Sequence, residues 1–212
     1  MHLPEGVLAG HTEIGTALVA VGALGYAAQR ARRTARSIDP PRVALAAGAV
    51  FALQMCNVPV GGGTSGHLLG ALLAAVLLGP WMGIIATSAV VGVQAALFAD
   101  GGIAVMGSNI VNMVLVPILI GYPLYVWMRD RTGVLTTASS GLAAAASVIG
   151  AVLAFDLEYV IGGIGPKASS VVGPMLVGHL PVAVGEAVIT AGVVALVALV
   201  RPARATSPEA IR

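Results

Sequence analysis

Two histidines far apart in the sequence have the chemistry to bind one metal ion. His2 follows Met1 directly, and His67 lies in the glycine-rich stretch GGGTSGHLLGA. In a chain that starts at Met1, the terminal amine, the backbone amide nitrogen of His2 and its Nδ1 can chelate one ion in a plane. Cu(II) and Ni(II) prefer such a nitrogen field, whereas calcium and magnesium prefer oxygen ligands and zinc prefers a tetrahedral site. An imidazole from elsewhere, such as that of His67, would complete a set of four nitrogens.

The residues around His67 indicate how it is held. The glycines of GGGTSG allow positive φ angles and a close approach of another segment. Ser65 or Thr64 is well placed to cap a helix that begins with His67. We therefore expect His67 at the start of a helix, within reach of the N-terminal segment.

The composition sets the class of protein that must position these histidines. Hydrophobic residues make up 58% of the 212 positions and charged residues only 9%, against about 25% charged in soluble domains. The mean hydropathy is +0.95, and the 28 glycines suit close packing of membrane helices. These values predict an all-α polytopic membrane protein. The single cysteine, Cys56, excludes an internal disulfide.

Apolar segments between polar breaks predict about seven transmembrane helices. The segments are 12–29, 43–57, 67–79, 81–98, 109–128, 134–155 and 174–200. A span needs about 20 apolar residues, so the short third segment could instead be a re-entrant or buried helix, which leaves six spans as the alternative. We expect one transmembrane helical domain over residues 1–200 and a short polar cytoplasmic tail over 201–212.

The basic residues orient this bundle. Ten of the eleven lysines and arginines follow the first, fifth and seventh segments, and only Lys167 falls on the other side. Cytoplasmic loops collect Lys and Arg, so the pattern predicts an N-terminus outside and a C-terminus inside. His2 and His67 then share the outer face. No basic run precedes the first segment, where Glu5, His11 and Glu13 stand, so we expect no cleavable signal peptide and a mature chain that keeps Met1.

Five stretches together resemble a known family. They are MHLPEG (1–6), VPVGGGTSGHLLGA (58–71), LLGPWMG (77–83), ALFADGGIAVMGSNIVNM (96–113) and HLPVAVGEAVIT (179–190). The chain resembles the cobalt/nickel permease family, the substrate-binding membrane (S) components of energy-coupling-factor ABC transporters. The resemblance covers nearly the whole chain, and its strongest parts are the N-terminal motif and the histidine loop.

The resemblance implies a function, a site and partners. It implies a seven-helix S-component fold that binds Co2+ or Ni2+ as transported substrate, with cobalt serving cobalamin synthesis, and no organic cofactor. The implied metal ligands are Met1, His2 and His67. The implied partners are a transmembrane coupling protein, a cytoplasmic ATPase pair and a small accessory membrane subunit. The implied location is the bacterial inner membrane, where the chain contacts lipid, and no nucleic-acid partner is implied. The chain has no G-x-x-x-x-G-K-[ST] phosphate loop, so ATP hydrolysis must come from another protein.

Other polar residues keep more than one interpretation. Asn109 and Asn112 are three residues apart and so share a helix face, where they would pair with a neighbouring helix or support the site. Met55 and Cys56 could offer soft ligands, but a small apolar thiol in a membrane core is more common. His11 and Glu13 are expected to be solvated residues at the outer interface.

His179 and Glu186 support the alternative function. They lie seven residues apart on one face of the last segment, and Glu186 is expected to be the only carboxylate well inside a span. An intramembrane acid is a functional candidate, either in a metal relay or proton-linked step or in an interhelical hydrogen bond. The rival to metal capture is a metal-independent polar channel or an intramembrane enzyme that uses these two residues. No HExxH or GxSxG motif is present, so we expect no enzyme, and the residues do not decide between cobalt and nickel.

Overall fold

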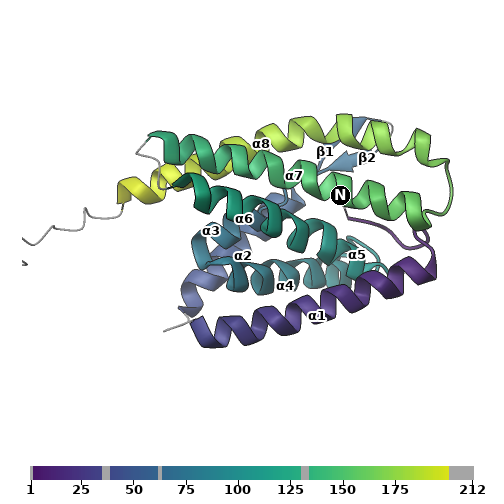
Figure 1. Ribbon diagram of the computed structural model, residues 1–212, viewed down its shortest axis with the longest axis horizontal. Helices are drawn as coiled ribbons and strands as arrows, with labels where there is room; N and C mark the ends of the chain where they lie inside the picture. The colour runs from purple at the N-terminus through teal and green to yellow at the C-terminus, as the bar shows by residue number, and fades with distance from the viewer. Residues whose placement is uncertain (1, 35–38, 62–63, 130–133, 201–212) are drawn as a thin grey trace, which may run out of the picture.

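The computed structural model describes residues 2–34, 39–61, 64–129 and 134–200. Within these ranges the chain forms seven helical segments and a small antiparallel hairpin (Figure 1). The elements, in chain order, are α1 (Gly10–Thr34), α2 (Pro40–Met55), β1 (Val58–Gly61), β2 (Thr64–Gly66), α3 (Ala71–Leu78), α4 (Pro80–Phe98), α5 (Met106–Ile110), α6 (Val116–Arg129), α7 (Val134–Gly162) and α8 (Val172–Val200). A π-helical turn, Val111–Leu115, joins α5 to α6 in one segment, and a 3-10 turn, Ala168–Ser170, precedes α8.

Four of these segments are long and apolar enough to cross a membrane by length and composition. They are Pro80–Phe98, Met106–Arg129, Thr136–Gly162 and Ala168–Val200. α1 is 25 residues long and carries Glu13 in its first turn and Arg32 and Arg33 in its last. The predicted all-α fold with seven helices is confirmed, and α3, with eight residues, is the short third segment. The predicted tail 201–212 lies outside the described residues.

The bundle surrounds the short helix α3. In Figure 1, α7 and α8 run side by side along one edge, α1 forms the opposite edge, and the shorter helices lie between them. The first five residues of α3 are all buried, and the helix packs against α2, α4, α6 and α7. A helix whose first five residues are enclosed by protein does not need the length of a membrane span, because its backbone there is buried among other helices.

The break between α3 and α4 falls where the sequence predicts it. Gly79 has φ +84°, a conformation that suits glycine. Pro80 then takes the first position of α4, where a missing N–H costs nothing. A Cβ on Gly83 would lie 2.7 Å from the Ala75 backbone, so α4 folds back closely along α3.

Two expectations about the helices are wrong. The third helix begins at Ala71 and not at His67, because the hairpin β1–β2 and four further residues precede it. The sixth predicted segment, 134–155, continues to Gly162 as α7, so it places Asp156 and Glu158 inside a helix, where both are buried. Glu186 is therefore not the only carboxylate within a membrane-length segment.

The close contact of α1 with α5 gives a test of the packing. A Cβ on Gly107 would lie 2.3 Å from the Ala17 backbone nitrogen, so Gly107→Ala must push the two helices apart. We expect a loss of about 1–3 kcal/mol, seen as a lower midpoint of thermal unfolding in detergent.

Gly22→Ala is the matched control on α1. A Cβ there meets nothing within 4 Å, and alanine is the better helix former, so its midpoint should be unchanged or slightly higher. Equal midpoints for the two variants would contradict the packing described here.

Candidate metal-binding site

The structure brings His2 and His67 together. Their ring centroids are 4.7 Å apart and the rings are tilted by 31°. Both side chains are buried, with 3% of the His2 side chain and 1% of His67 exposed. Met1, the third predicted ligand, lies outside the described residues. Two imidazoles from segments 65 positions apart thus share one buried place.

Asn109 positions the backbone next to His2. The Leu3 N–H donates to Asn109 Oδ1 at 2.7 Å, and Asn109 Nδ2 donates to the Leu3 carbonyl at 3.3 Å. The Gly102 N–H donates to the same carbonyl at 2.8 Å. Three hydrogen bonds therefore fix residue 3, and they direct the preceding residue, His2, toward His67.

Two consecutive glycines let the N-terminal segment come this close. Gly101 has φ +97°, and a Cβ there would lie 3.0 Å from Asn109 Nδ2 and 3.3 Å from His2 Cδ2. A Cβ on Gly102 would lie 2.5 Å from Glu5 Cγ. The turn after α4 therefore forms a cradle that only residues without a Cβ can build.

Apolar contacts hold the rest of the segment against the bundle. Leu3 and Leu8 are buried with Val105, Phe155 and Tyr159. Leu8 also pairs with Gly163 in an isolated antiparallel bridge, and the Ala9 N–H donates to the Gly162 carbonyl at 2.7 Å. The N-terminal segment is thus anchored to the fold at Leu3 and at Leu8 and Ala9, while residues 4–6 between them are exposed.

His67 lies in the short connection between β2 and α3. Glu186, two turns beyond His179 on α8, accepts hydrogen bonds from the N–H groups of Leu69 and Gly70 at 2.9 and 2.7 Å. Gln54 on α2 donates to the Leu69 carbonyl at 2.7 Å. Side chains from two helices thus fix the backbone directly after His67.

The contacts of the two rings leave Nε2 of His67 free and place an acceptor beside each nitrogen of His2. Nδ1 of His67 is 2.9 Å from the Leu68 carbonyl, which can only accept, so Nδ1 carries the proton and Nε2 is free. Nε2 of His2 is 3.2 Å from Gln94 Oε1 and Nδ1 of His2 is 3.2 Å from Asp100 Oδ1, so an acceptor lies beside each nitrogen of this ring. Neither His2 Nδ1 nor His67 Nε2 has a hydrogen-bond partner among the described residues. Buried polar atoms without a partner are costly, and a metal ion would satisfy both.

The electrostatics keep both rings neutral. Burial lowers the pKa of His2 to about 4, although the nearby Asp100 carboxylate raises it in part. Burial and the adjacent His2 ring lower the pKa of His67 well below its ordinary value. Neutral imidazole is the form that binds metal, so at pH 7 neither ring must lose a proton first.

Side chains alone do not make a complete metal site here. Among the described residues, no three His, Cys, Asp or Glu side chains gather as a metal-binding group. Asp100 comes near, with Oδ1 3.2 Å from His2 Nδ1, and it can balance the charge of a bound cation.

Sequence reasoning missed Gln94 and Asp100 as neighbours of His2. Gln94 is fully buried in α4, and a fully buried amide in a membrane-length helix is a signal that it has a partner. Asp100 stands directly before the glycine pair in ADGG, a turn whose glycines could have indicated a close approach.

The two asparagines have different partners. Asn109 supports the site, as one of its two interpretations predicts. Asn112 lies in the π-helical turn and donates to Glu158 Oε2 on α7 at 2.9 Å. Each of the two interpretations therefore fits one asparagine, since Asn112 pairs with a neighbouring helix and Asn109 holds the backbone beside His2.

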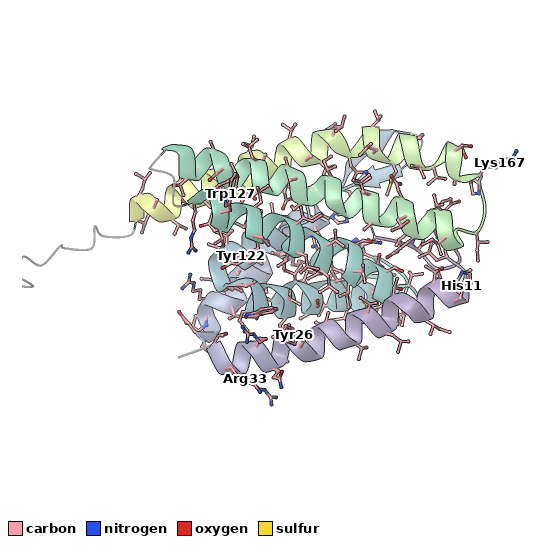
Figure 2. The ribbon with its side chains drawn as sticks, viewed as in Figure 1. His11, Tyr26, Arg33, Tyr122, Trp127 and Lys167 are labelled. Carbon is pink, nitrogen blue, oxygen red and sulfur yellow. The ribbon has the colours of Figure 1, made fainter. Side chains whose placement is uncertain are left out.

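The remaining candidates lie away from these contacts or serve the helices. Nδ1 of His179 is 2.8 Å from the Met175 carbonyl one turn earlier in α8. Cys56 is exposed after the end of α2 and Met55 is 38% exposed, so the metal-ligand interpretation gains no support. Figure 2 shows His11 at the end of the molecule where Lys167 lies, far from Arg33 at the other end of α1.

The model of one protein family matches this chain from residue 2 to residue 204. It describes the cobalt uptake substrate-specific transmembrane region. The chain belongs to this family. The resemblance seen in the sequence is thereby confirmed.

Individual relatives agree with the family. A cobalt transport protein of Sorangium cellulosum is 34% identical over 95% of this chain and 93% of its own length. A fused nickel transport protein of Rhodobacter capsulatus is 37% identical over 59% of this chain and 36% of its own length. The crystal structure of a truncated transition metal transporter has a TM-score of 0.87 at 30% identity, and covers 94% of this chain and 99% of that one.

The general function of the chain follows from its membership of the cobalt uptake family. The chain is a multi-pass membrane protein, the substrate-specific transmembrane component for cobalt or nickel uptake. It is a transport subunit and not an enzyme, so the intramembrane-enzyme alternative is excluded.

Loss of the Asn109 contacts should weaken metal binding. Asn109→Ala removes both side-chain hydrogen bonds to Leu3 and frees the segment that carries His2. Loss of a group that orients a ligand typically costs 10–100-fold in metal affinity, so we expect a Ni2+ dissociation constant raised by about that factor in calorimetric titration.

Asn112→Ala is the control for this change. It removes a buried amide of the same size, one helical turn after Asn109, and the hydrogen-bond partner of this amide is Glu158. Its Ni2+ affinity should stay near that of the parent, and an equal loss in both variants would contradict the role given to Asn109.

Proposed function

We propose that this chain captures Co2+ or Ni2+ with four nitrogens: the Met1 amine, the backbone amide nitrogen and Nδ1 of His2, and Nε2 of His67. The observation that carries this proposal is the pair of buried imidazoles 4.7 Å apart, each with a nitrogen that makes no hydrogen bond. On His2 this nitrogen is Nδ1, the one that can close a six-membered ring with its own backbone amide. An Nε2–H donated to Gln94 leaves Nδ1 to the metal ion, and the Asp100 carboxylate beside Nδ1 then balances the charge of that ion.

The surroundings support binding of a divalent cation. Chelation through a backbone amide releases its proton, so the amide contributes one negative charge to the site. The Asp100 carboxylate beside His2 supplies another. A dication in a buried site is costly unless it is paired, and these two charges balance it.

Both cobalt and nickel fit this set. Affinity at a nitrogen site rises from Co2+ to Ni2+, and a planar field mildly favours nickel. The relatives divide in the same way, since one is named a cobalt transport protein and the other a fused nickel transport protein. Supply of cobalt for cobalamin synthesis and supply of nickel to nickel enzymes therefore both remain proposals.

We infer that the metal enters from the extracytoplasmic face of a bacterial inner membrane. Figure 2 places Lys167 and His11 at one end of the bundle and Arg33 at the other. The arginine-rich end is cytoplasmic by the positive-inside rule, which puts the N-terminus outside. In the same orientation the tail 201–212 would be cytoplasmic.

Uptake against a gradient requires other proteins. This chain carries no phosphate-binding loop for ATP, and family membership points to an energy-coupling-factor importer. We propose a transmembrane coupling protein, a cytoplasmic ATPase pair and a small accessory membrane subunit as its partners.

A polar channel through His179 and Glu186 has less support. The Glu186 carboxylate accepts hydrogen bonds from Leu69 and Gly70, and His179 binds a carbonyl of its own helix. Groups committed to such contacts do not form a continuous polar path.

The free amine is the most direct test of the chelate. Acetylation of the Met1 amine removes the lone pair of its nitrogen and leaves both imidazoles in place. We expect Ni2+ affinity in calorimetric titration to fall by at least 100-fold, because three of the four nitrogens no longer bind as one unit. Mass spectrometry should confirm that the parent chain starts at an unmodified Met1, and unchanged affinity in the acetylated chain would rule out the amine as a ligand.

His67→Ala removes the fourth nitrogen and leaves the other three. We expect a clear loss of affinity with an intact fold, checked by thermal unfolding without metal. His11→Ala, a change at the far end of the N-terminal helix from Arg33, should bind as the parent does.

Reconstitution into liposomes separates capture from a channel. The chain alone should bind 63Ni2+ but not accumulate it, whereas the complete transporter with ATP should. Rapid equilibration of metal through the chain alone would support the channel instead.

A further inference from the structure

A buried carboxylate on α8 fixes the backbone next to His67. Glu186 is 2% exposed, and its two oxygens accept from the N–H groups of Leu69 and Gly70 at 2.9 and 2.7 Å. Within the described part of the chain no cation pairs with it. A carboxylate kept in a membrane-length helix without a cation is expensive, and its hydrogen bonds all go to this one connection.

These two N–H groups lie at the start of α3. The first N–H groups of a helix have no partner within the helix, and α3 begins at Ala71 with Gly70 as its N-cap residue. The side chain of Gly70 can offer no cap, and Glu186, from another helix, accepts from the N–H of this N-cap residue and from that of Leu69 just before it. A negative charge at a helix N-terminus is also favoured by the helix dipole.

Other contacts hold the same two residues. Gln54 donates to the Leu69 carbonyl. Gly70 has φ +66°, and the Val50 side chain lies where a Cβ of residue 70 would point. The Leu68 side chain lies against Gly185, the neighbour of Glu186. Residues 68–70 are therefore held from α2 on one side and α8 on the other, directly after His67.

We propose that Glu186 is a positioning residue for metal capture, which holds residues 69 and 70 so that Nε2 of His67 faces His2. This inference rests on the proposed planar site and adds α8 to the parts that build it. Glu186 does not touch the metal. Its effect reaches the ion through two peptide units and the His67 ring.

The test is Glu186→Gln, with Ni2+ as the probe. Glutamine has one acceptor oxygen, and its NH2 group would face a backbone N–H, so one of the two hydrogen bonds is lost. We expect the Ni2+ dissociation constant to rise about 10–100-fold. The ligand-field absorption band of bound Ni2+ should also shift to longer wavelength, because water replaces the His67 nitrogen while the N-terminal nitrogens stay bound.

Glu158→Gln is the matched control. Glu158 is also a buried carboxylate of a membrane-length helix, and its partner is Asn112. This variant should keep the affinity and the spectrum of the parent. Thermal unfolding without metal is measured for both variants, since a merely structural role of Glu186 would lower the midpoint and leave the spectrum of bound Ni2+ unchanged.

Gln54→Met tests the same connection if Glu186→Gln does not fold. It removes the hydrogen bond to Leu69 from the α2 side and should shift the spectrum in the same direction by a smaller amount. A parent-like affinity and spectrum in Glu186→Gln would overturn the proposal. A parent-like spectrum of bound Ni2+ in both Glu186→Gln and Gln54→Met would overturn it as well. His67→Ala is run beside them: if it loses affinity while Glu186→Gln does not, only this inference fails, and if it binds as the parent does, the planar site itself fails.

Discussion

The candidate site depends on the hydrogen bonds between Asn109 and the backbone of Leu3. Without them the first residues would be a free chain end, and ordering each residue would cost about 1–2 kcal/mol in backbone entropy. Two buried hydrogen bonds, each contributing about 0.5–1.5 kcal/mol, oppose that cost in a place that water does not reach. Because the Leu3 backbone is fixed, the direction of His2 is fixed as well.

The second imidazole is held by separate contacts. His67 follows a hairpin and precedes a helix of only eight residues, neither of which could fix a ring alone. Glu186 and Gln54 provide the rigidity from α8 and α2. The site is therefore the meeting point of two short segments, each held by polar side chains of long helices in an apolar bundle where such contacts are not weakened by water.

Composition and periodicity were enough to predict the all-α bundle, its seven segments and the break at Gly79 and Pro80, because these depend on local properties. The pairing of His2 with His67 could be predicted from topology and resemblance. The start of α3 at Ala71 could not, because the backbone directly before it is held by Glu186, 116 residues beyond Gly70. The roles of Gln94 and Asp100 likewise depend on which helices pack together, which no local pattern shows.

The central claim is that backbone and imidazole nitrogens together bind the metal ion. X-ray absorption spectroscopy of the Ni2+-loaded protein, purified without any N-terminal extension, tests it most directly. Four nitrogen ligands in a plane, with the outer-shell scattering of two imidazole rings, are the predicted result. A six-ligand shell rich in oxygen, or scattering from only one imidazole, would contradict it.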